Sequence, residues 1–225
     1  MKVYLLPGVA CDRRLFAGFK LQGLNVEVIE WPVISPEHSL ADIAGMISDR
    51  IERESDHVLV GVSMGGMVAQ ELAMITRPRK VILISSITGP HEWPPLLHVS
   101  RRFRLHNLIT DLTMRSTWPI RQWWNKGDPK IAKVLFDMAV KQTAQQIRYC
   151  AGAILRWPGA KYEGELIRIH GDRDTLLPLR FPVDHVVRGG SHVMMISRPN
   201  EIARLVQQEL RPVVERSAQS RPLSA

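Results

Sequence analysis

A glycine-flanked serine between an apolar run and a helical pattern constrains this chain most. Residues 57–62 are almost continuously apolar, as expected for a strand that is buried on both faces of a parallel sheet. Gly61-Val62-Ser63-Met64-Gly65-Gly66 comes at the end of this run, and a helical pattern then reaches residue 75. In a Gly-x-Ser-x-Gly turn between a strand and a helix, the serine occupies a strained corner that exposes its Oγ. The sequence therefore predicts that Ser63 is a nucleophile at the carboxyl edge of a sheet.

Short β-like runs alternate with helical patterns on both sides of this turn. Such alternation is typical of a mostly parallel sheet that is covered by helices. Helices are expected from Ser39, as N-cap, to about Arg53 and from Pro199 to about Leu210. The expected strands are residues 3–6, 26–29, 57–62, 81–84, 166–169 and 183–187.

The alternation stops between residues 87 and 157, where helical patterns and most of the tryptophans occur. We interpret residues 87–157 as a helical lid inserted into an α/β core formed by residues 1–86 and 158–210. Residues 211–225 have no apolar periodicity and are expected to form a flexible tail.

Composition excludes several classes of protein. Cys11 and Cys150 are the two cysteines, which make no disulfide framework and no zinc spacing, so a cytoplasmic protein without metal or other cofactor is expected. No apolar run approaches the ~20 residues of a membrane span, and no secretory leader is expected. The formal net charge is +8. No zinc finger, RNA-binding aromatic pattern or basic helix accompanies this charge, so a specific nucleic-acid partner is not expected.

Part of the basic excess lies within the expected lid, where eight lysines and arginines but three acids occur between residues 91 and 136. Two interpretations remain open. The cluster is either a solvated surface or an entrance whose field attracts an anionic small-molecule substrate.

A serine hydroxyl needs a neighbouring base, and His192 is the candidate because Gly189-Gly190-Ser191 precedes it in a small-residue loop. The histidine in turn needs a carboxylate that holds its tautomer. Asp172 and Asp174 both lie just after an expected strand, at the edge where α/β sites form. We favour Asp174 as this carboxylate, and we expect Asp172 to brace the turn.

A developing oxyanion needs two N–H donors. One is expected from Met64, the residue after the nucleophile, and the other from Val9 in the loop after the first strand. The alternative for Pro7-Gly8 is an ordinary turn that ends a strand.

Taken together, these segments resemble the α/β-hydrolase superfamily. The shared features are the order Ser, Asp, His, the Gly-Val-Ser-Met-Gly-Gly turn, the segment from His170 to Pro178 and the Gly-Gly-Ser-His loop. The resemblance implies an α/β-hydrolase fold with a trimmed, mostly parallel sheet of about six strands, helices on both faces and a helical lid. Leu5-Leu6-Pro7-Gly8 resembles the variant in which Pro replaces His before the oxyanion-loop glycine. The 18 residues from Asp174 to His192 are fewer than is usual in this superfamily.

This resemblance implies a serine hydrolase that cleaves an ester or thioester through an acyl-enzyme. Other chemistry on the same scaffold (carbon–carbon bond hydrolysis, lyase or perhydrolase reactions) remains an alternative, as does a non-hydrolytic binding protein. The candidate substrate-binding residues are Trp118, Trp123, Trp124, Arg101 and Arg102, with Leu96, Leu97 and Phe103 as further pocket candidates. The aromatic residues equally suit a core of the lid itself.

Overall fold

One parallel sheet of six strands organises the computed structural model, which describes residues 1–53, 55–116 and 129–219. The strand order is β2-β1-β3-β4-β5-β6, and every neighbouring pair is parallel. The strands are β1 Lys2–Leu6, β2 Asn25–Val28, β3 His57–Val62, β4 Lys80–Ile84, β5 Leu166–Gly171 and β6 His185–Val187. This sheet confirms the six-stranded α/β architecture expected from the sequence.

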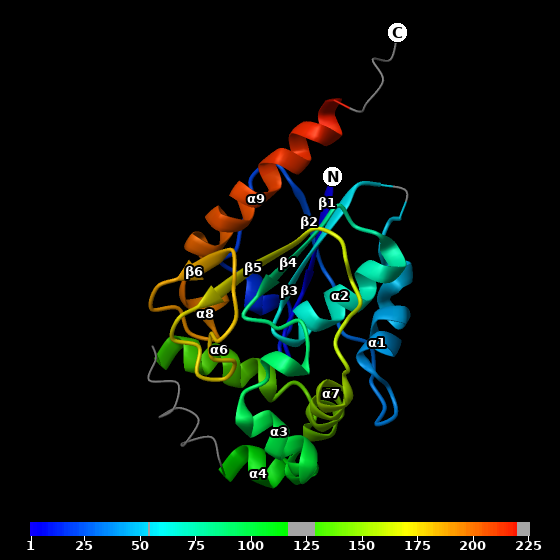
Figure 1. Cartoon of the computed structure of the whole chain (residues 1–225). Helices are drawn as coiled ribbons and strands as arrows, with labels where there is room; N and C mark the ends of the chain where they lie inside the picture. Colours follow the sequence, from blue (N-terminus) through cyan, green and yellow to red (C-terminus); the bar gives the residue numbers. More distant parts are fainter. Residues whose placement is uncertain (54, 117–128, 220–225) are drawn as a thin grey trace.

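Helices cover both faces of the sheet and its carboxyl end (Figure 1). The α-helices are α1 Leu40–Ile47, α2 Met64–Thr76, α3 Pro95–Arg102, α4 Asp111–Ser116, α6 Pro129–Ala139, α7 Ala144–Arg156, α8 Met194–Ser197 and α9 Pro199–Gln219. Short 3₁₀ helices are η1 Arg13–Phe16, η2 Ser48–Arg50, η3 Pro90–Glu92 and η4 Leu105–Leu108.

The sheet separates two apolar layers because successive side chains of a strand point to opposite faces. In β1, Tyr4 and Leu6 belong to the layer that contains residues of α1, α2 and α7. Val3 and Leu5 belong to the other layer, with residues of η1, α8 and α9. The central strand β3 is buried along its whole length, as its apolar sequence predicted. Burial on both faces holds β3 in place, and the site is built at the carboxyl end of this strand.

Helix α1 begins as the sequence predicted. Ser39 Oγ accepts a hydrogen bond from the Asp42 amide (3.1 Å), and the Asp42 carboxylate accepts one from the Ser39 amide (2.8 Å). This reciprocal capping box satisfies two amides at the helix start. The α-helix ends at Ile47, and η2 continues the chain to Arg50, so the helix is shorter than expected.

Two other boundaries also differ from the expected ones. Strand β6 begins at His185 rather than at residue 183, because the Asp184 carboxylate accepts the Arg168 amide (2.8 Å) where a strand carbonyl would otherwise do so. Helix α9 passes Leu210 and continues to Gln219. Val213 accounts for the first turn beyond Leu210, since it is buried and extends the apolar row of Ile202, Val206 and Leu210.

Between β4 and β5, the described residues form α3, α4, α6, α7 and two 3₁₀ helices, most of which lie beyond the carboxyl ends of the strands (Figure 1). Its last helix is joined to the main core. Cys150, Ala153 and Leu155 of α7 are buried in the layer of α1 and α2. Trp157, directly after α7, donates from Nε1 to the buried Glu71 carboxylate of α2 (2.6 Å).

Candidate active site

Ser63 occupies a sharp corner between β3 and α2. Its backbone has φ 54° and ψ −121°, a conformation that L-residues rarely adopt. Four hydrogen bonds hold this corner. The Ser63 amide donates to Ile84 O (3.0 Å), and the Ser63 carbonyl accepts from Ser86 Oγ (2.7 Å) and from the amides of Gly66 (2.9 Å) and Met67 (3.4 Å). The strained turn predicted from the sequence is therefore present and supported from the neighbouring strand.

Close backbone approach explains the glycines on either side of Ser63. A Cβ on Gly61 would collide with the carbonyl of Gly65. A Cβ on Gly65 would collide with the carbonyl oxygens of Leu6 and Pro7 at the end of β1. Without side chains at these positions, the first turn of α2 reaches both β3 and β1, and the positive end of its dipole lies beside Ser63.

His192 reaches Ser63 from the loop after β6. Its Nε2 lies 3.1 Å from Ser63 Oγ, and its Nδ1 lies 2.8 Å from Asp174 Oδ2. The loop approaches β5 so closely that a Cβ on Gly171 would collide with the Gly190 carbonyl. The structure thus brings the three predicted side chains into one hydrogen-bonded row, although His192 comes only 18 positions after Asp174.

Asp174 is buried, and all its contacts favour the ionised form. Its Oδ2 faces His192 Nδ1 and, at 3.3 Å, His170 Nε2. Its Oδ1 accepts the amides of Leu176 (2.9 Å) and Leu177 (2.8 Å). Burial by itself would raise the pKa of Asp174, but these hydrogen bonds outweigh it and hold the pKa far below the ordinary value of an aspartate.

Asp172, the alternative acid, has a different partner. Its Oδ1 accepts the Gly189 amide at 2.6 Å, and Gly189 has φ 70°. Asp172 therefore ties the end of β5 to the left-handed turn that precedes His192, and Asp174 is the aspartate that contacts the histidine.

The loop after β1 lies against Ser63. A Cβ built on Gly8 would lie 3.4 Å from Ser63 Cβ. The Gly8 carbonyl points away into the loop, where it accepts the Cys11 amide (3.3 Å) and Trp31 Nε1 (3.4 Å). Neither Val9 N–H nor Met64 N–H donates to an acceptor within the described part of the chain.

The expected substrate-binding residues that the structure describes lie on α3 or directly after it. Arg101 and Arg102 are exposed at the end of α3, over the rings of Trp93 (5.8 Å) and Phe103 (5.9 Å) respectively. Leu96 and Phe103 are also exposed, whereas Leu97 packs against the core layer of α1 and α2. Trp118, Trp123 and Trp124 lie outside the described residues.

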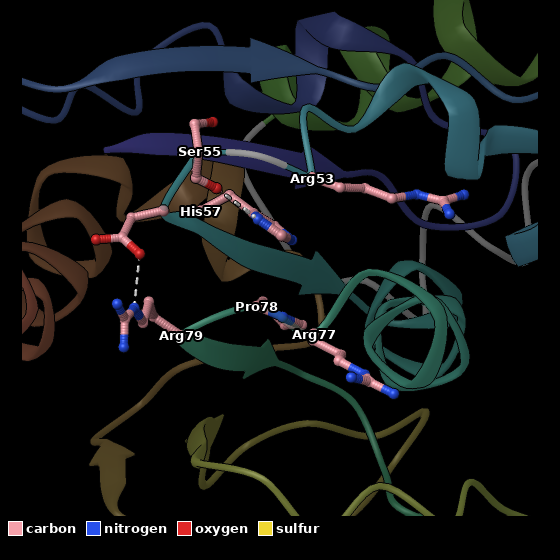
Figure 2. Close-up of a pocket in the computed structure, with 7 residues that line it drawn as sticks. Arg53, Ser55, His57, Arg77, Pro78 and Arg79 are labelled. Atoms are coloured by element: carbon pink, nitrogen blue, oxygen red, sulfur yellow. Dashed lines mark hydrogen bonds and ion pairs between the residues drawn. The ribbon is translucent and has the colours of Figure 1, made fainter.

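A cavity of about 440 Å³ lies at the opposite, amino-terminal end of β3 and β4. Its arginines diverge: Arg53 and Arg77 extend to one side and Arg79 to the other (Figure 2). Arg79 is paired with Asp56 through a 2.6 Å hydrogen bond. The cavity is thus remote from Ser63, and its positive charges do not converge.

Comparison with known proteins identifies the family. Residues 5–205 match the sequence model of the alpha/beta hydrolase family. This chain belongs to that family. Membership confirms the resemblance, the fold class and the prediction of a hydrolase.

Individual members of the family are distant relatives. A pimeloyl-[acyl-carrier protein] methyl ester esterase of Yersinia pseudotuberculosis is 24% identical over 193 residues, which cover 75% of this chain and 74% of that protein. A thermophilic esterase from Thermogutta terrifontis has a TM-score of 0.70 at 17% identity, covering 95% of this chain and 90% of that one. MenH from S. aureus has a TM-score of 0.72 at 14% identity, covering 94% of each chain.

Two features are absent from the part of the chain that the structure describes. Across residues 1–53, 55–116 and 129–219, no group of three His, Cys, Asp or Glu side chains is arranged to hold a metal ion. In the same ranges, no helix is both long enough and apolar enough to cross a membrane.

Sequence reasoning missed two members of the hydrogen-bonded network, His170 and Ser86. No role of its own was predicted for His170, which directly follows the expected strand 166–169 and lies four residues before Asp174. Ser86 follows β4, and the pairing of Val62 with Ile84 brings it beside Ser63. Neither contact is visible without the strand register.

Proposed function

We propose that this chain hydrolyses an ester or thioester of a small or acyl substrate through an acyl-enzyme on Ser63. The observation that carries the proposal is the row of two hydrogen bonds from Ser63 Oγ through His192 to Asp174, 3.1 Å and 2.8 Å long. This arrangement suits removal of the Ser63 proton at the moment of attack.

In the proposed first half-reaction, Ser63 Oγ attacks the substrate carbonyl carbon and passes its proton to His192 Nε2. The resulting imidazolium is stabilised by the Asp174 carboxylate, which stays ionised because of its lowered pKa. The tetrahedral intermediate collapses, and His192 gives the proton to the departing alcohol or thiol. Water then repeats the sequence on the acyl-enzyme, releasing the acid and restoring Ser63.

We assign the oxyanion hole to the amides of Val9 and Met64. Met64 is the first residue of α2, where helix amides are free of intrahelical acceptors. Gly8 lies beside Ser63, which supports the participation of the next amide, that of Val9. Loss of one such donor typically lowers kcat by roughly 10²- to 10³-fold.

The substrate class is part of the proposal. The Yersinia relative is an esterase of an acyl-carrier-protein methyl ester, which supports a carboxylic ester with an acyl chain. A preference for anionic substrates would depend on Arg101 and Arg102. It predicts that Arg101→Ala/Arg102→Ala raises KM for anionic esters at low salt while leaving neutral esters unaffected.

Labelling with a fluorophosphonate probe tests the proposal directly, because the probe phosphorylates an activated serine. We expect a single adduct on the wild type by intact mass, none on Ser63→Ala, and strongly slowed labelling of His192→Ala. Ser55→Ala, at the other end of the sheet, is the control and should label like the wild type. A wild type that is folded but unlabelled, or an adduct that persists on Ser63→Ala, would refute the role of Ser63.

After labelling, a panel of p-nitrophenyl esters and acyl-CoA thioesters would define the leaving group and acyl length. Labelling without turnover on any ester or thioester would favour the other chemistries of this scaffold.

A further inference from the structure

We infer that His170 is a positioning residue for the Asp174–His192 pair, holding the carboxylate in the orientation that His192 requires. The inference rests on the proposed function. It assigns no contact between His170 and the substrate. Its role is exerted through Asp174.

The partners of the His170 ring show that its Nε2 bears a proton. The side chain is 1% exposed at the end of β5, and its Nε2 lies 2.8 Å from the Leu177 carbonyl and 3.3 Å from Asp174 Oδ2. A carbonyl oxygen only accepts hydrogen bonds, and an ionised carboxylate does the same. Nε2 therefore carries a proton, and His170 donates it to both oxygens.

Both histidines share one oxygen of Asp174. Oδ2 faces His192 Nδ1 at 2.8 Å as well as His170 Nε2, whereas Oδ1 accepts the Leu176 and Leu177 amides. Rotation of the carboxylate about its Cβ–Cγ bond would break contacts on both oxygens. His170 adds a second restraint, because its bond to the Leu177 carbonyl closes the turn whose amides hold Oδ1.

His170 is itself held in place from the side of η3. The Phe181 ring meets its imidazole edge to face at 5.2 Å, and the Arg168 guanidinium lies 4.2 Å from the centre of the same Phe181 ring. Arg168 makes a two-pronged ion pair with the buried Glu92 carboxylate, with distances of 2.8 and 2.7 Å. These contacts place two charged partners near His170: Asp174 in direct contact and, beyond Phe181, the Arg168–Glu92 pair.

A matched pair of substitutions separates hydrogen bonding from packing. In His170→Gln, the amide Nε2 is as many bonds from Cα as the imidazole Nε2, so a donor is kept. In His170→Met, a methyl group occupies that position and no donor remains. Because the two side chains have the same length, their comparison isolates the hydrogen bond to Asp174 and Leu177.

For the Met variant we expect kcat on a p-nitrophenyl ester to fall by roughly tenfold with KM little changed, since a hydrogen bond to a charged group is lost. The Gln variant should recover most of this loss. The acidic limb of the kcat/KM profile, which reports His192, should move to higher pH in the Met variant, because Oδ2 then serves His192 alone. The low-field NMR signal of the His192 Nδ1 proton should shift in the Met variant and stay near its wild-type position in the Gln variant.

Equal kcat, pH profile and NMR signal for the Met and Gln variants would overturn the inference, since His170 would then merely fill space. Losses that follow the melting temperature alone in both variants would overturn it as well. Ser63→Ala and His192→Ala are measured in the same assay. Wild-type activity in either of them would mark failure of the proposed function, independently of the comparison at position 170.

Discussion

Ser86 Oγ donates a 2.7 Å hydrogen bond to the backbone carbonyl of Ser63. The donor belongs to the segment after β4 and the acceptor to the turn after β3, so the bond joins two neighbouring strand ends. Because Ser63 has a strained backbone, this bond bears on the orientation of its Oγ as well as on stability.

Ser86→Ala should lower both stability and kcat. We expect the free energy of unfolding to fall by about 1 kcal/mol, the usual net value of such a bond, and kcat to fall more than KM rises. Denaturant titration and ester kinetics check this. Ser55→Ala is the matched control, because Ser55 Oγ also donates to a backbone carbonyl, that of Glu52, but in an exposed turn. Equal effects of the two substitutions would contradict a special role for Ser86.

Gly65→Ala should prevent or strongly weaken folding, since the new methyl group would collide with the Leu6 and Pro7 carbonyls, which belong to rigid backbone. Gly45→Ala offers a control within α1, where a Cβ would meet no atom within 4 Å. There the substitution should raise stability by about 0.5–1 kcal/mol through helix propensity. Thermal melts of the two variants measure the contrast, and a stable, active Gly65→Ala protein would disprove the close packing of α2.

Asp174→Asn and Asp172→Asn should differ in kcat. Asn at position 174 no longer offers His192 a charged acceptor, and the analogous loss in other serine hydrolases lowers kcat by about 10⁴-fold. Asn at position 172 retains an oxygen that can accept the Gly189 amide, so a change of less than about tenfold is expected. Steady-state kinetics on one ester decides between them. The reverse order would move the role of the triad acid to Asp172.

Glu71→Gln should stabilise the protein at neutral pH. Burial raises the pKa of Glu71 despite the opposing hydrogen bond from Trp157. The folded state therefore holds this proton more tightly than the unfolded state does. As a result, the contribution of Glu71 to the free energy of unfolding is most favourable below the unfolded pKa, and it falls as the pH rises from there through the folded pKa. The free energy of unfolding falls by at most about 1.4 kcal/mol per pH unit in this range.

The amide of Gln can still accept from Trp157 but does not ionise, so the stability advantage of Glu71→Gln should vanish in acid. Unfolding at a series of pH values measures it. A constant difference between the two proteins at all pH values would contradict the raised pKa.

Local sequence was sufficient to predict the features that are formed by neighbouring residues. The apolar run before Ser63, the glycines around it and the capping box at Ser39 each have a local physical cause, and the strand, the turn and the helix start all occur as predicted. The sheet also followed from alternation of strands and helices, since parallel strands require crossover connections.

Features that depend on distant partners could not be predicted in the same way. The start of β6 depends on the Asp184 carboxylate meeting the Arg168 amide, and the extension of α9 past Leu210 depends on a buried place for Val213. His170 lies four residues from Asp174, yet its role in the network depends on the turn that brings the Leu177 carbonyl to its Nε2. Nothing in the sequence indicates which of the expected pocket side chains are exposed, as Leu96 and Phe103 are, and which pack against the core, as Leu97 does.

Strands β4 and β5 are hydrogen-bonded neighbours, although residues 85–165 separate them along the chain. During synthesis, the ribosome delivers Ser63 and its supporting strands long before Asp174 and His192 emerge. Under the proposed function, a nascent chain that ends anywhere before β5 would carry Ser63 without its base and without the acid that orients that base. Ester hydrolysis would therefore begin only once the last part of the chain has been made and folded onto the sheet.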